Sequence, residues 1–421
     1  MPQTAGDTYF RKGFGLKAEV QSALAADYAG RVVELLREHD NTLTVGDVTI
    51  RLAQEFGFCY GVERAVEYAY QTRHKFPGYE RRVILVGEII HNPNVNQRMR
   101  EMGIDILAPR SASQPNEPRF DYSGITRDDV VLLPAFGVTI ADFTALREIG
   151  CIVVDTTCGS VLHVWKRVES YARDGFTVLI HGKQYHEETR ATASQVSRFP
   201  ERHYLIVRDM NEAEIVCRYI ESLGQGRATT EDSAALLTRF ADAVSPGFDP
   251  ARDLTRIGVA NQTTMLARES LAIGAAVGAA MGRGFGEAYR SANFRTFDTI
   301  CSATQERQDA VLELLKEPLD AMIVIGGYNS SNTISLAALC AERVATYHVE
   351  TAEGIDPATR TISYREAGVH HHEAAKTDWV SATGPLRVGI TAGASTPNNM
   401  IGEAVTRVLA TRGVSADIPN A

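Results

Sequence analysis

The chain has 421 residues, of which 44% are hydrophobic, and its 43 basic and 52 acidic residues give a formal net charge of −9. This length predicts two or three domains, and the hydrophobic share supports a buried core and argues against intrinsic disorder. The acidic balance excludes general affinity for nucleic acid, and no apolar run reaches the roughly 18–20 residues that a membrane span requires.

The cysteine content and the N-terminal residues indicate in which cellular compartment the protein is expected. Six cysteines in 421 residues are too few for a disulfide scaffold. The first 30 residues contain Asp7, Glu19 and Asp27 and lack an apolar stretch, so they do not resemble a signal or transit peptide. We therefore expect a cytoplasmic protein whose cysteines are thiols, metal ligands or nucleophiles.

Residues 1–47 are predicted to form an N-terminal extension, in which the apolar spacing of Val20–Arg37 indicates a helix. From residue 48 a pattern repeats three times. Each copy has a strand-like run ending at a cysteine, an amphipathic helix, and two β-rich runs that each end in a polar loop. The predicted units are residues 48–157, 158–300 and 301–405, followed by a C-terminal tail at 406–421.

In the first copy, the strand Val48–Leu52 leads to Cys59, and a helix is expected over Val62–Ala69. The strands Val83–Val86 and Asp129–Leu133 follow. Their polar loops are Glu88–Asn94 and Pro134–Gly137.

In the second copy, the strand Ile152–Asp155 leads to Cys158, and a helix is expected over Val161–Val168. The strands Thr177–Ile180 and Arg256–Val259 follow. Their polar loops are His181–Glu188 and Asn261–Thr264.

In the third copy, the strand Phe294–Phe297 leads to Cys301, and a helix is expected over Gln305–Leu315. The strands Met322–Ile325 and Leu386–Ile390 follow. Their polar loops are Gly326–Asn332 and Thr391–Pro397.

Two stretches interrupt the pattern and are predicted to be insertions. Ser222–Asp253, rich in Gly, Ser, Thr and Asp, interrupts the second unit, and Glu350–Gly384 interrupts the third. The latter contains His370, His371 and His372, and a triple histidine can bind metal. Because no second cluster of ligands lies nearby in the sequence, we favour a solvated loop.

Strands that alternate with helices predict βαβ units, an α/β fold and mainly parallel sheets. In such sheets ligands bind outside the carboxyl ends of the strands. Three units could therefore direct six polar loops and three cysteines towards one shared centre. The alternative is that the repetition has no functional meaning, because α/β proteins commonly look repetitive.

The cysteines fall into two groups. Cys59, Cys158 and Cys301 each lie between a strand and a helix, where a turn exposes the side chain and a helix N-terminus favours the thiolate. The other three lie in apolar strand-like or helical segments and are expected to act as small hydrophobic residues. They are Cys151, Cys217 and Cys340.

Three thiolates from distant turns could hold zinc or an iron–sulfur cluster. Zinc would need a fourth ligand, and structural zinc sites usually contain close C-x-x-C pairs, which do not occur here. A 4Fe-4S cluster with three cysteines would leave one iron open to bind substrate as a Lewis acid, which suggests catalysis. A thiol nucleophile needs only one cysteine with a histidine base and would leave the three similar turns unexplained.

A series of motifs, in unbroken order from about residue 48 to 405, resembles the 4-hydroxy-3-methylbut-2-enyl diphosphate reductase family. The motifs are Phe58-Cys59-Tyr60-Gly61-Val62, Ile90-His91-Asn92-Pro93, Asp155-Thr156-Thr157-Cys158, His181-Gly182-Lys183 with His186-Glu187-Glu188-Thr189, Asn261-Gln262-Thr263-Thr264, Cys301-Ser302-Ala303-Thr304-Gln305-Glu306-Arg307-Gln308, Asn329-Ser330-Ser331-Asn332 and Ala392-Gly393-Ala394-Ser395. The chain is most similar to the longer plant and cyanobacterial branch, which has an N-terminal extension resembling Arg11–Gly15.

The resemblance implies a trefoil of three pseudo-symmetric α/β domains around one 4Fe-4S cluster, held by Cys59, Cys158 and Cys301. The family performs the last step of the methylerythritol phosphate route to isoprenoid precursors. It removes the hydroxyl of the substrate with two electrons and protons, giving isopentenyl and dimethylallyl diphosphate. The substrate oxygen binds the open iron.

The resemblance also implies roles for individual residues. Glu188 matches the proton-relay glutamate, Thr263 matches the threonine that hydrogen-bonds the substrate hydroxyl, and His186 matches a histidine close to the substrate. The residues that match diphosphate ligands, or lie next to them, are His91, Ser330, Asn332, Ser395, Ser331 and Thr264.

Each of these residues has a plainer interpretation. Glu188 could be a surface carboxylate in a loop, and Thr263 could cap a helix that starts near Met265. Ser330 and Ser395 could be helix caps in the same way. The histidines outside the motifs are interpreted as structural; these are His163 and His203.

The chain departs from the family pattern at two places. Many bacterial members have a diphosphate-binding histidine where this chain has Phe136, so we transfer no ligand role to Phe136 and expect His91 and the serines to hold the diphosphate. Gly159-Ser160 follows Cys158 where this branch usually has Pro-Trp. That change could loosen the start of the helix but leaves the ligand in place.

The sequence contains no G-x-G-x-x-G after a strand, no P-loop and no D-D-x-x-D run. We therefore expect a separate protein to deliver electrons, with ferredoxin the expected donor and flavodoxin the next. A homodimer is one possible assembly. The main alternative function is a non-catalytic iron–sulfur carrier or redox sensor, which the loops rich in Ser, Thr, Asn and Glu disfavour, and a zinc-bound structural protein is a third.

Overall fold

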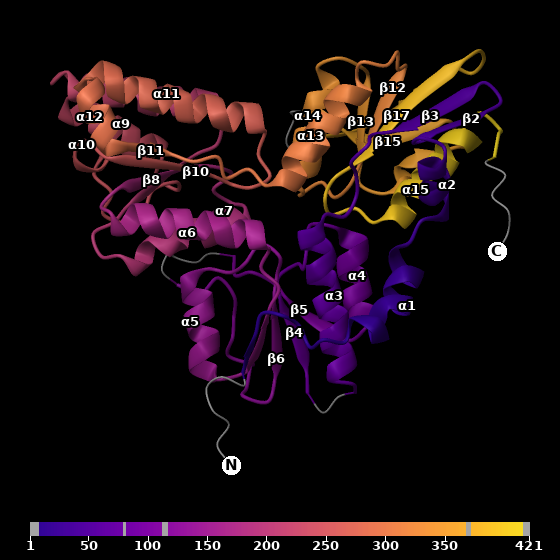
Figure 1. Ribbon diagram of the computed structural model, residues 1–421, viewed down its shortest axis with the longest axis horizontal. Helices are drawn as coiled ribbons and strands as arrows, with labels where there is room; N and C mark the ends of the chain where they lie inside the picture. The colour runs from indigo at the N-terminus through magenta and orange to yellow at the C-terminus, as the bar shows by residue number, and fades with distance from the viewer. Residues whose placement is uncertain (1–7, 79–80, 112–116, 368–371, 416–421) are drawn as a thin grey trace. The chain divides into compact units, whose positions relative to one another are not determined.

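The computed structural model describes residues 8–78, 81–111, 117–367 and 372–415. The chain divides into two compact units. Their helices and strands are labelled in Figure 1. The first unit comprises Met1–Gly13, Phe76–Ile89 and Ile104–Cys301, and the second comprises Phe14–Lys75, Ile90–Gly103 and Ser302–Ala421. Among the described helices, none combines the length and the apolar character that crossing a bilayer requires.

The first unit contains two sheets in which all strand pairs are parallel. One has the order β1-β7-β6-β4-β5 and the other β11-β10-β8-β9. The strands are β1 (Tyr9–Phe10), β4 (Val83–Val86), β5 (Ile104–Leu107), β6 (Val130–Leu133), β7 (Ile152–Asp155), β8 (Thr177–His181), β9 (Tyr204–Val207), β10 (Ile257–Asn261) and β11 (Phe294–Thr296). The helices are α5 (Ile140–Ile149), α6 (Gly159–Arg173), α7 (Glu187–Ser194), α8 (Met210–Gly224), α9 (Thr230–Arg239), α10 (Pro250–Asp253), α11 (Ala267–Phe285) and α12 (Glu287–Asn293).

The second unit contains one larger mixed sheet of order β14-β15-β13-β12-β17-β3-β2, with β16 paired to β15. Its strands are β2 (Thr42–Val45), β3 (Val48–Leu52), β12 (Ala321–Ile325), β13 (Thr346–Val349), β14 (Ile355–Asp356), β15 (Thr361–Arg365), β16 (Glu373–Thr377) and β17 (Leu386–Ala392). Its helices are α1 (Lys17–Tyr28), α2 (Arg31–Glu38), α3 (Tyr60–Lys75), α4 (Pro93–Glu101), α13 (Ser302–Leu314), α14 (Ser331–Ala341) and α15 (Asn398–Ala410). The predicted α/β class with mainly parallel sheets is confirmed.

The same order of four parallel strands occurs in all three sheets. The equivalent sets are β7-β6-β4-β5, β11-β10-β8-β9 and β3-β17-β12-β13. In each set the strand that leads to a turn cysteine lies beside the strand that ends in the second polar loop. The chain order reverses between the strands that carry the first and second polar loops. Because ligands of α/β sheets bind at such a switch point, the strand order places both polar loops at the binding edge of each sheet.

The strand β3 does not lie where the sequence order suggested. We expected Val48–Leu52 to open the first unit, but it pairs in parallel with β17, from Leu386↔Val48 to Ile390↔Leu52. Val48 and Ile50 are fully buried there, because this face of β3 packs in the core of the second unit. A strand from the N-terminal part of the chain thus completes the third sheet, and the boundaries of the three predicted units stay a prediction.

The prediction of one helix over Val20–Arg37 is wrong, because α1 ends at Tyr28 and α2 begins at Arg31. The break lies at Gly30, whose backbone is extended, with φ −130° and ψ 102°. A Cβ atom at Gly30 would lie 2.4 Å from the carbonyl oxygen of Asn398, at the start of α15. The chain therefore needs a residue without a side chain where its backbone meets that of α15.

One predicted polar loop and one predicted insertion lead into or contain helices. The loop after β4 continues into α4, where Asn92 caps the helix by accepting a hydrogen bond from the Val95 N–H and Pro93 occupies the first turn. The insertion Ser222–Asp253 contains the helices α9 and α10.

The second insertion, Glu350–Gly384, contains the antiparallel strands β14, β15 and β16. Of its three consecutive histidines, only His372 lies among the described residues. It is exposed, with Nδ1 3.5 Å from Glu366 Oε2, which fits the predicted solvated segment.

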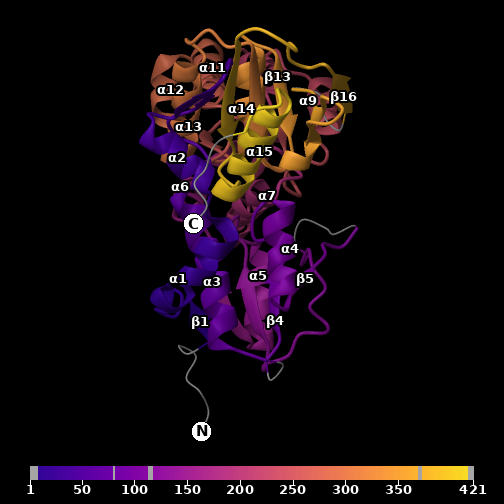
Figure 2. The ribbon, with the colours of Figure 1, turned by 90° about the vertical axis from the view of Figure 1, so that its right-hand side faces the viewer.

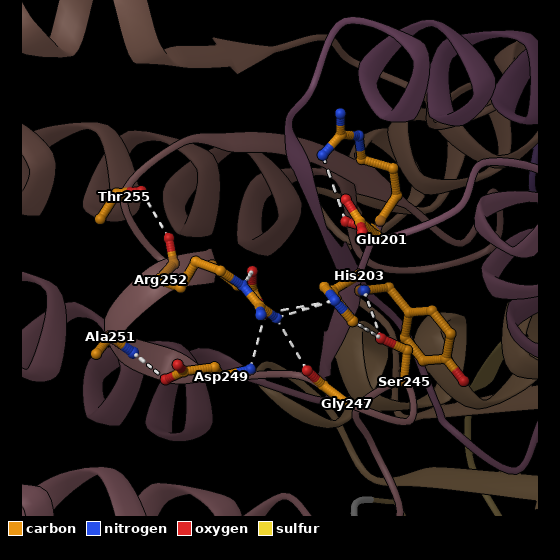
Figure 3. Close-up of polar contacts among 11 residues, drawn as sticks. Glu201, His203, Ser245, Gly247, Asp249, Ala251, Arg252 and Thr255 are labelled. Atoms are coloured by element: carbon orange, nitrogen blue, oxygen red, sulfur yellow. Dashed lines mark hydrogen bonds and ion pairs between the residues drawn. The ribbon is translucent and has the colours of Figure 1, made fainter.

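A histidine network anchors the end of the first insertion (Figure 3). Arg252 donates to Nε2 of His203 at 3.0 Å, and Nδ1 of His203 lies 3.0 Å from Ser245 Oγ. Arg252 also bonds the carboxylate of Asp253. Because Nε2 accepts from Arg252, Nδ1 carries the proton of the neutral ring and cannot act as a base on Ser245. The set is a structural network, as predicted for His203.

We expect Gly30→Ala to lower stability, because the new methyl group would collide with the backbone at Asn398. Overpacking of this kind costs about 1–3 kcal/mol. Thermal unfolding followed by circular dichroism measures the effect. Gly124→Ala is the control, because nothing lies within 4 Å of a Cβ atom there. Equal melting temperatures for the two variants would contradict the close approach at Gly30.

Candidate active site

The three turn cysteines all lie immediately before a helix. Cys59 precedes α3, Cys158 is the N-cap residue of α6, and Cys301 precedes α13. Their side chains are half-buried thiols. The other three cysteines are buried, and burial raises the pKa of Cys151 and Cys217 to about 11 and that of Cys340 to about 12. This separation matches the predicted division into turn and core cysteines.

One backbone contact fixes each turn cysteine in the same way. The cysteine N–H donates to a carbonyl oxygen in the second polar loop of its sheet. The pairs are Cys59 with Ala394 at 3.3 Å, Cys158 with Ala135 at 2.9 Å, and Cys301 with Thr263 at 3.3 Å. Because these loops follow the equivalent strands β17, β6 and β10, the three cysteines occupy equivalent places in the three sheets.

The Asp-Thr-x-Cys signature shared by two copies has a structural explanation. Asp155 accepts a hydrogen bond from the Thr157 N–H at 2.9 Å, which is an Asx-turn. Asp298 accepts from the Ile300 N–H at 3.0 Å in the same way. The threonine hydroxyls then donate to carbonyl oxygens of the neighbouring strands. These bonds are Thr156 to Leu133 at 2.6 Å and Thr299 to Asn261 at 3.1 Å. The signature therefore shapes the turn that presents each cysteine.

Glu188 is a buried carboxylate, not a surface group. Its side chain is 1% exposed in the first turn of α7. Its Oε1 accepts a hydrogen bond from the Thr263 N–H at 2.6 Å, and its own N–H donates to Nδ1 of His186 at 3.1 Å. Because Nδ1 accepts, the neutral ring of His186 carries its proton on Nε2. The three residues that the resemblance placed at the reacting end of the substrate are Glu188, Thr263 and His186. In the first unit, Glu188 bonds both of the others directly.

Gln262 joins the two polar loops of the second sheet. Its Oε1 accepts from the Lys183 N–H at 3.1 Å and from the Thr189 hydroxyl at 2.9 Å. Its Nε2 donates to Thr264 Oγ1 at 2.8 Å. The interpretation of Thr263 as a helix cap is not supported, because α11 begins only at Ala267, after Leu266. The role of Gln262 was missed because a buried glutamine carries no distinctive pattern in the sequence.

Two buried basic side chains of the first unit have lowered pKa values. Burial lowers the pKa of Lys183 to about 8 and that of His181 to about 4. His181 is therefore neutral at pH 7, with Nδ1 2.8 Å from Ser270 Oγ. An anion bound beside Lys183 would offset the cost of burying its charge and raise its pKa.

Phe136 packs against His186. The two rings meet edge to face, with centroids 5.6 Å apart and planes at 82°. Next to it, Gly137 has φ 74°, and a Cβ atom there would lie 2.5 Å from the ring of Trp165. A phenyl ring offers no hydrogen-bond donor, and what the structure shows for Phe136 is this packing contact with His186.

The second unit brings the serine loops together. Ser395 Oγ donates to the His91 carbonyl at 3.1 Å and lies 3.4 Å from Ser330 Oγ. Ser330 does cap α14, accepting from the Thr333 N–H, whereas the N-cap residue of α15 is Pro397, so Ser395 is not a cap. Of these two serines, only Ser330 is a helix cap, as the alternative interpretation of the sequence allowed.

Two more polar groups of this cluster bear on ligand binding. Asn332 Oδ1 accepts from the Ala394 N–H at 2.9 Å. Ser331 Oγ is buried and has no hydrogen-bond partner among the described residues. Because buried hydroxyls are nearly always satisfied, this atom fits a site that an external acceptor completes.

The segment around His91 belongs to the same cluster. Asn92 Nδ2 donates to the Ser395 carbonyl at 2.9 Å. A Cβ atom at Gly327 would lie 2.4 Å from the His91 carbonyl oxygen, so the two loops touch through their backbones. The helices α4 and α14 both start in these loops. Helix N-termini favour bound anions.

Asp27, in the N-terminal extension, joins three helices of the second unit. Figure 2 shows α1, which carries Asp27, beside α3. Asp27 Oδ2 accepts from the Tyr70 hydroxyl of α3 at 2.5 Å and from Arg98 Nε of α4 at 2.9 Å. Its carbonyl accepts from Asn399 Nδ2 of α15 at 2.9 Å. Burial and the Asp27 carboxylate both raise the pKa of Tyr70. The helices α3, α4 and α15 begin just after Cys59, His91 and Ser395.

Comparisons with known proteins show the family to which the chain belongs. The family described as LytB protein matches residues 50–409. A 4-hydroxy-3-methylbut-2-enyl diphosphate reductase of Thermosynechococcus vestitus is 44% identical over 412 residues, covering 98% of this chain and 96% of the relative. The enzyme of the same name from Gloeobacter violaceus is 46% identical over 408 residues, covering 96% and 93%.

A solved structure has the same fold. It is that of the E-1-hydroxy-2-methyl-but-2-enyl-4-diphosphate reductase from Plasmodium falciparum, with a TM-score of 0.58 and 18% identity. The similarity covers 86% of this chain and 87% of that chain.

We expect Asp27→Ala to destabilise the protein, because it removes the carboxylate that accepts from both the Tyr70 hydroxyl and Arg98 Nε. Loss of such a partly buried charged acceptor costs about 1–3 kcal/mol. Differential scanning calorimetry measures the effect. Glu101→Ala is the control, because Glu101 pairs with the same Arg98 at the surface, where an ion pair contributes at most about 1 kcal/mol. A loss no greater than in the control would contradict the joining role of Asp27.

Proposed function

The chain belongs to the LytB family, and on this premise we propose that it is a 4-hydroxy-3-methylbut-2-enyl diphosphate reductase. The reaction is the reductive removal of the substrate hydroxyl, which gives isopentenyl and dimethylallyl diphosphate at the end of the methylerythritol phosphate route. The observation that carries the proposal is the common backbone contact of Cys59, Cys158 and Cys301, which prepares three equivalent thiols, as a three-cysteine cluster requires.

The three cysteines fit an iron–sulfur cluster as its ligands. Each thiol is half-buried and lies before the N-terminus of a helix, where the helix dipole favours thiolate ligands and a negatively charged group. We assign one 4Fe-4S cluster to Cys59, Cys158 and Cys301. When bound, the cluster supplies the electrons and a Lewis-acidic iron for the substrate oxygen.

Glu188 is proposed to move the proton that the departing water needs. Breaking the C–O bond consumes two electrons and two protons. One proton goes to the leaving oxygen, which departs as water, and the other proton goes to carbon. Glu188 is buried and held by the Thr263 N–H, so its carboxyl has a fixed position. The Thr263 hydroxyl would hydrogen-bond the same substrate oxygen, and the Nε2–H of His186 would act as a donor beside it.

The serine loops are proposed to hold the diphosphate. Hydroxyl, amide and imidazole donors with helix N-termini behind them can bind this group without a P-loop. The buried, unpartnered hydroxyl of Ser331 supports this assignment. The residues assigned are His91, Ser330, Ser331, Asn332, Ser395 and Thr264. Because Phe136 provides no donor, His91 and the serines would make the contacts that a histidine makes in many relatives.

The function is tested by an anaerobic assay of the purified, cluster-loaded protein with dithionite-reduced viologen and the diphosphate alcohol. We propose that a separate protein is the natural donor, with ferredoxin first and flavodoxin second. A well-loaded cluster with no turnover would favour the alternative of a non-catalytic iron–sulfur carrier.

We expect Cys59→Ser, Cys158→Ser and Cys301→Ser each to lose most of the bound iron and the visible iron–sulfur absorption, because each change removes one thiolate ligand. Iron analysis and absorption spectroscopy measure the loss. Cys217→Ala is the control, because Cys217 is 5% exposed in the core and should leave the iron content unchanged. Full iron loading in any of the three serine variants would remove that residue from the ligand set.

Glu188→Gln should abolish proton transfer while keeping the size of the side chain. Loss of a general acid lowers turnover by about 10²- to 10⁴-fold. The viologen-coupled assay measures turnover, and the visible spectrum checks that the cluster is intact. Glu214→Gln is the control, because Glu214 is exposed on α8 and pairs with Arg218 of the same helix at 3.9 Å. A Glu188→Gln enzyme as active as its control would refute the proton role.

A further inference from the structure

We propose that a basic face of the first unit docks an acidic protein that delivers the electrons. The face is formed by Arg167 of α6, Arg290 of α12, Arg295 of β11 and Phe297. This inference rests on the proposed reductase function, because the reaction needs two electrons and the sequence contains no G-x-G-x-x-G after a strand for a nicotinamide cofactor.

The face contains a pocket of about 480 Å³. Its lining includes Arg167, Arg290 and Arg295 together with the hydroxyls of Ser170 and Ser291, and contains no aspartate or glutamate. The whole chain has a net charge of −9, so a pocket lined by arginines and by no carboxylate differs in charge from the chain as a whole. A positive face on an acidic protein selects a partner with an acidic surface and steers it into place.

The arginines differ in how far their charge is already paired. Arg295 pairs with Asp174 at 2.5 Å, and Arg290 pairs with Glu287. In the part of the chain that the structure describes, Arg167 has no carboxylate in ion-pair range, and its guanidinium lies 3.9 Å from the ring centroid of Phe297. Arg167 is therefore the positive charge that remains for a partner.

The elements of this face lead to two of the proposed cluster ligands. Phe297 is 39% exposed and lies four residues before Cys301. The ring of His163, in the helix that follows Cys158, lies 5.7 Å from that of Phe297. Arg167 is about 14 Å along α6 from Cys158, at 1.5 Å per residue. A carrier docked at Phe297 and Arg167 would thus contact the segments that hold Cys158 and Cys301.

The composition of the face fits a protein interface. Arginine and aromatic residues supply most of the binding energy at interfaces, and weak redox encounters use small contact areas. The main competitor is Tyr60, which is 79% exposed beside Cys59. On the same helix, Glu67 pairs with Lys17 at 3.2 Å, so that surface has mixed charge and no preference for an acidic partner.

The test compares two electron donors on the same cluster-loaded enzyme. A reduced acidic ferredoxin must dock, whereas reduced methyl viologen is a small cation that needs no protein interface. We expect Arg167→Glu and Phe297→Ser to lower kcat/KM with ferredoxin by about tenfold or more, and to leave the viologen rate unchanged. The wild-type ferredoxin rate should fall as ionic strength rises, and Arg167→Glu should lose most of this dependence.

Arg283→Glu is the matched control, because Arg283 is exposed on α11 and pairs with Glu221, away from the pocket lining. An unchanged ferredoxin kcat/KM in Arg167→Glu would overturn the proposal, as would an equal loss with both donors. A loss in Tyr60→Ser but not in Arg167→Glu would place docking on the other surface and also overturn it.

Docking can be measured separately from catalysis. Calorimetric titration of the oxidised enzyme with oxidised ferredoxin should show binding that Arg167→Glu weakens by about tenfold. If the wild type binds ferredoxin in this way but converts no diphosphate with viologen, the proposed reaction fails and the docking face stands. If the wild type turns over with viologen but Arg167→Glu binds ferredoxin normally, the docking face fails and the reaction stands.

Discussion

The hydrogen bond from each turn cysteine to the second polar loop of its sheet is the constraint on which the candidate site depends. It can form only if the strand before the cysteine lies beside the strand before that loop. For Cys158 and Cys301 these strands follow one another along the chain, as β6 with β7 and β10 with β11. For Cys59 the neighbour is β17, more than 300 residues later, so β3 must return to the last sheet of the chain. The first strand of the repeat, β3, therefore pairs with its last strand, β17.

Local groups, rather than the net charge, support each of the sites proposed for this acidic protein. In the second unit, the Ser331 hydroxyl and the helix N-termini offer neutral donors, so the proposed site could hold an anion without a cluster of lysines. In the first unit, Glu188 is buried because the Thr263 N–H compensates its carboxylate. At the surface, the Arg167 guanidinium packs against the ring of Phe297, and no carboxylate among the described residues pairs with it, so its charge is available to a partner. The net charge of −9 predicts none of these sites.

Much of the fold was predictable because parallel strands buried on both faces are short continuous apolar runs. Val83–Val86 and Ile152–Asp155 coincide with β4 and β7 for this reason. The motif order also predicted contacts within the site, such as Glu188 with Thr263. What could not be predicted depends on partners distant in the sequence. The break at Gly30 results from the backbone of Asn398, and the place of β3 from β17.

The N-terminal extension was predicted only as an addition to the repeat, and its contacts indicate that it supports the site in both units. In the first unit, β1 pairs with β7, and the Tyr9 hydroxyl donates to Asp155 at 2.5 Å. Asp155 forms the Asx-turn that presents Cys158, so Tyr9 buttresses that turn. In the second unit, Asp27 holds the helices that begin after Cys59, His91 and Ser395. Tyr70 and Arg98 lie in the later turns of α3 and α4, so Asp27 joins the bodies of these two helices, and its backbone carbonyl adds Asn399 in the first turn of α15.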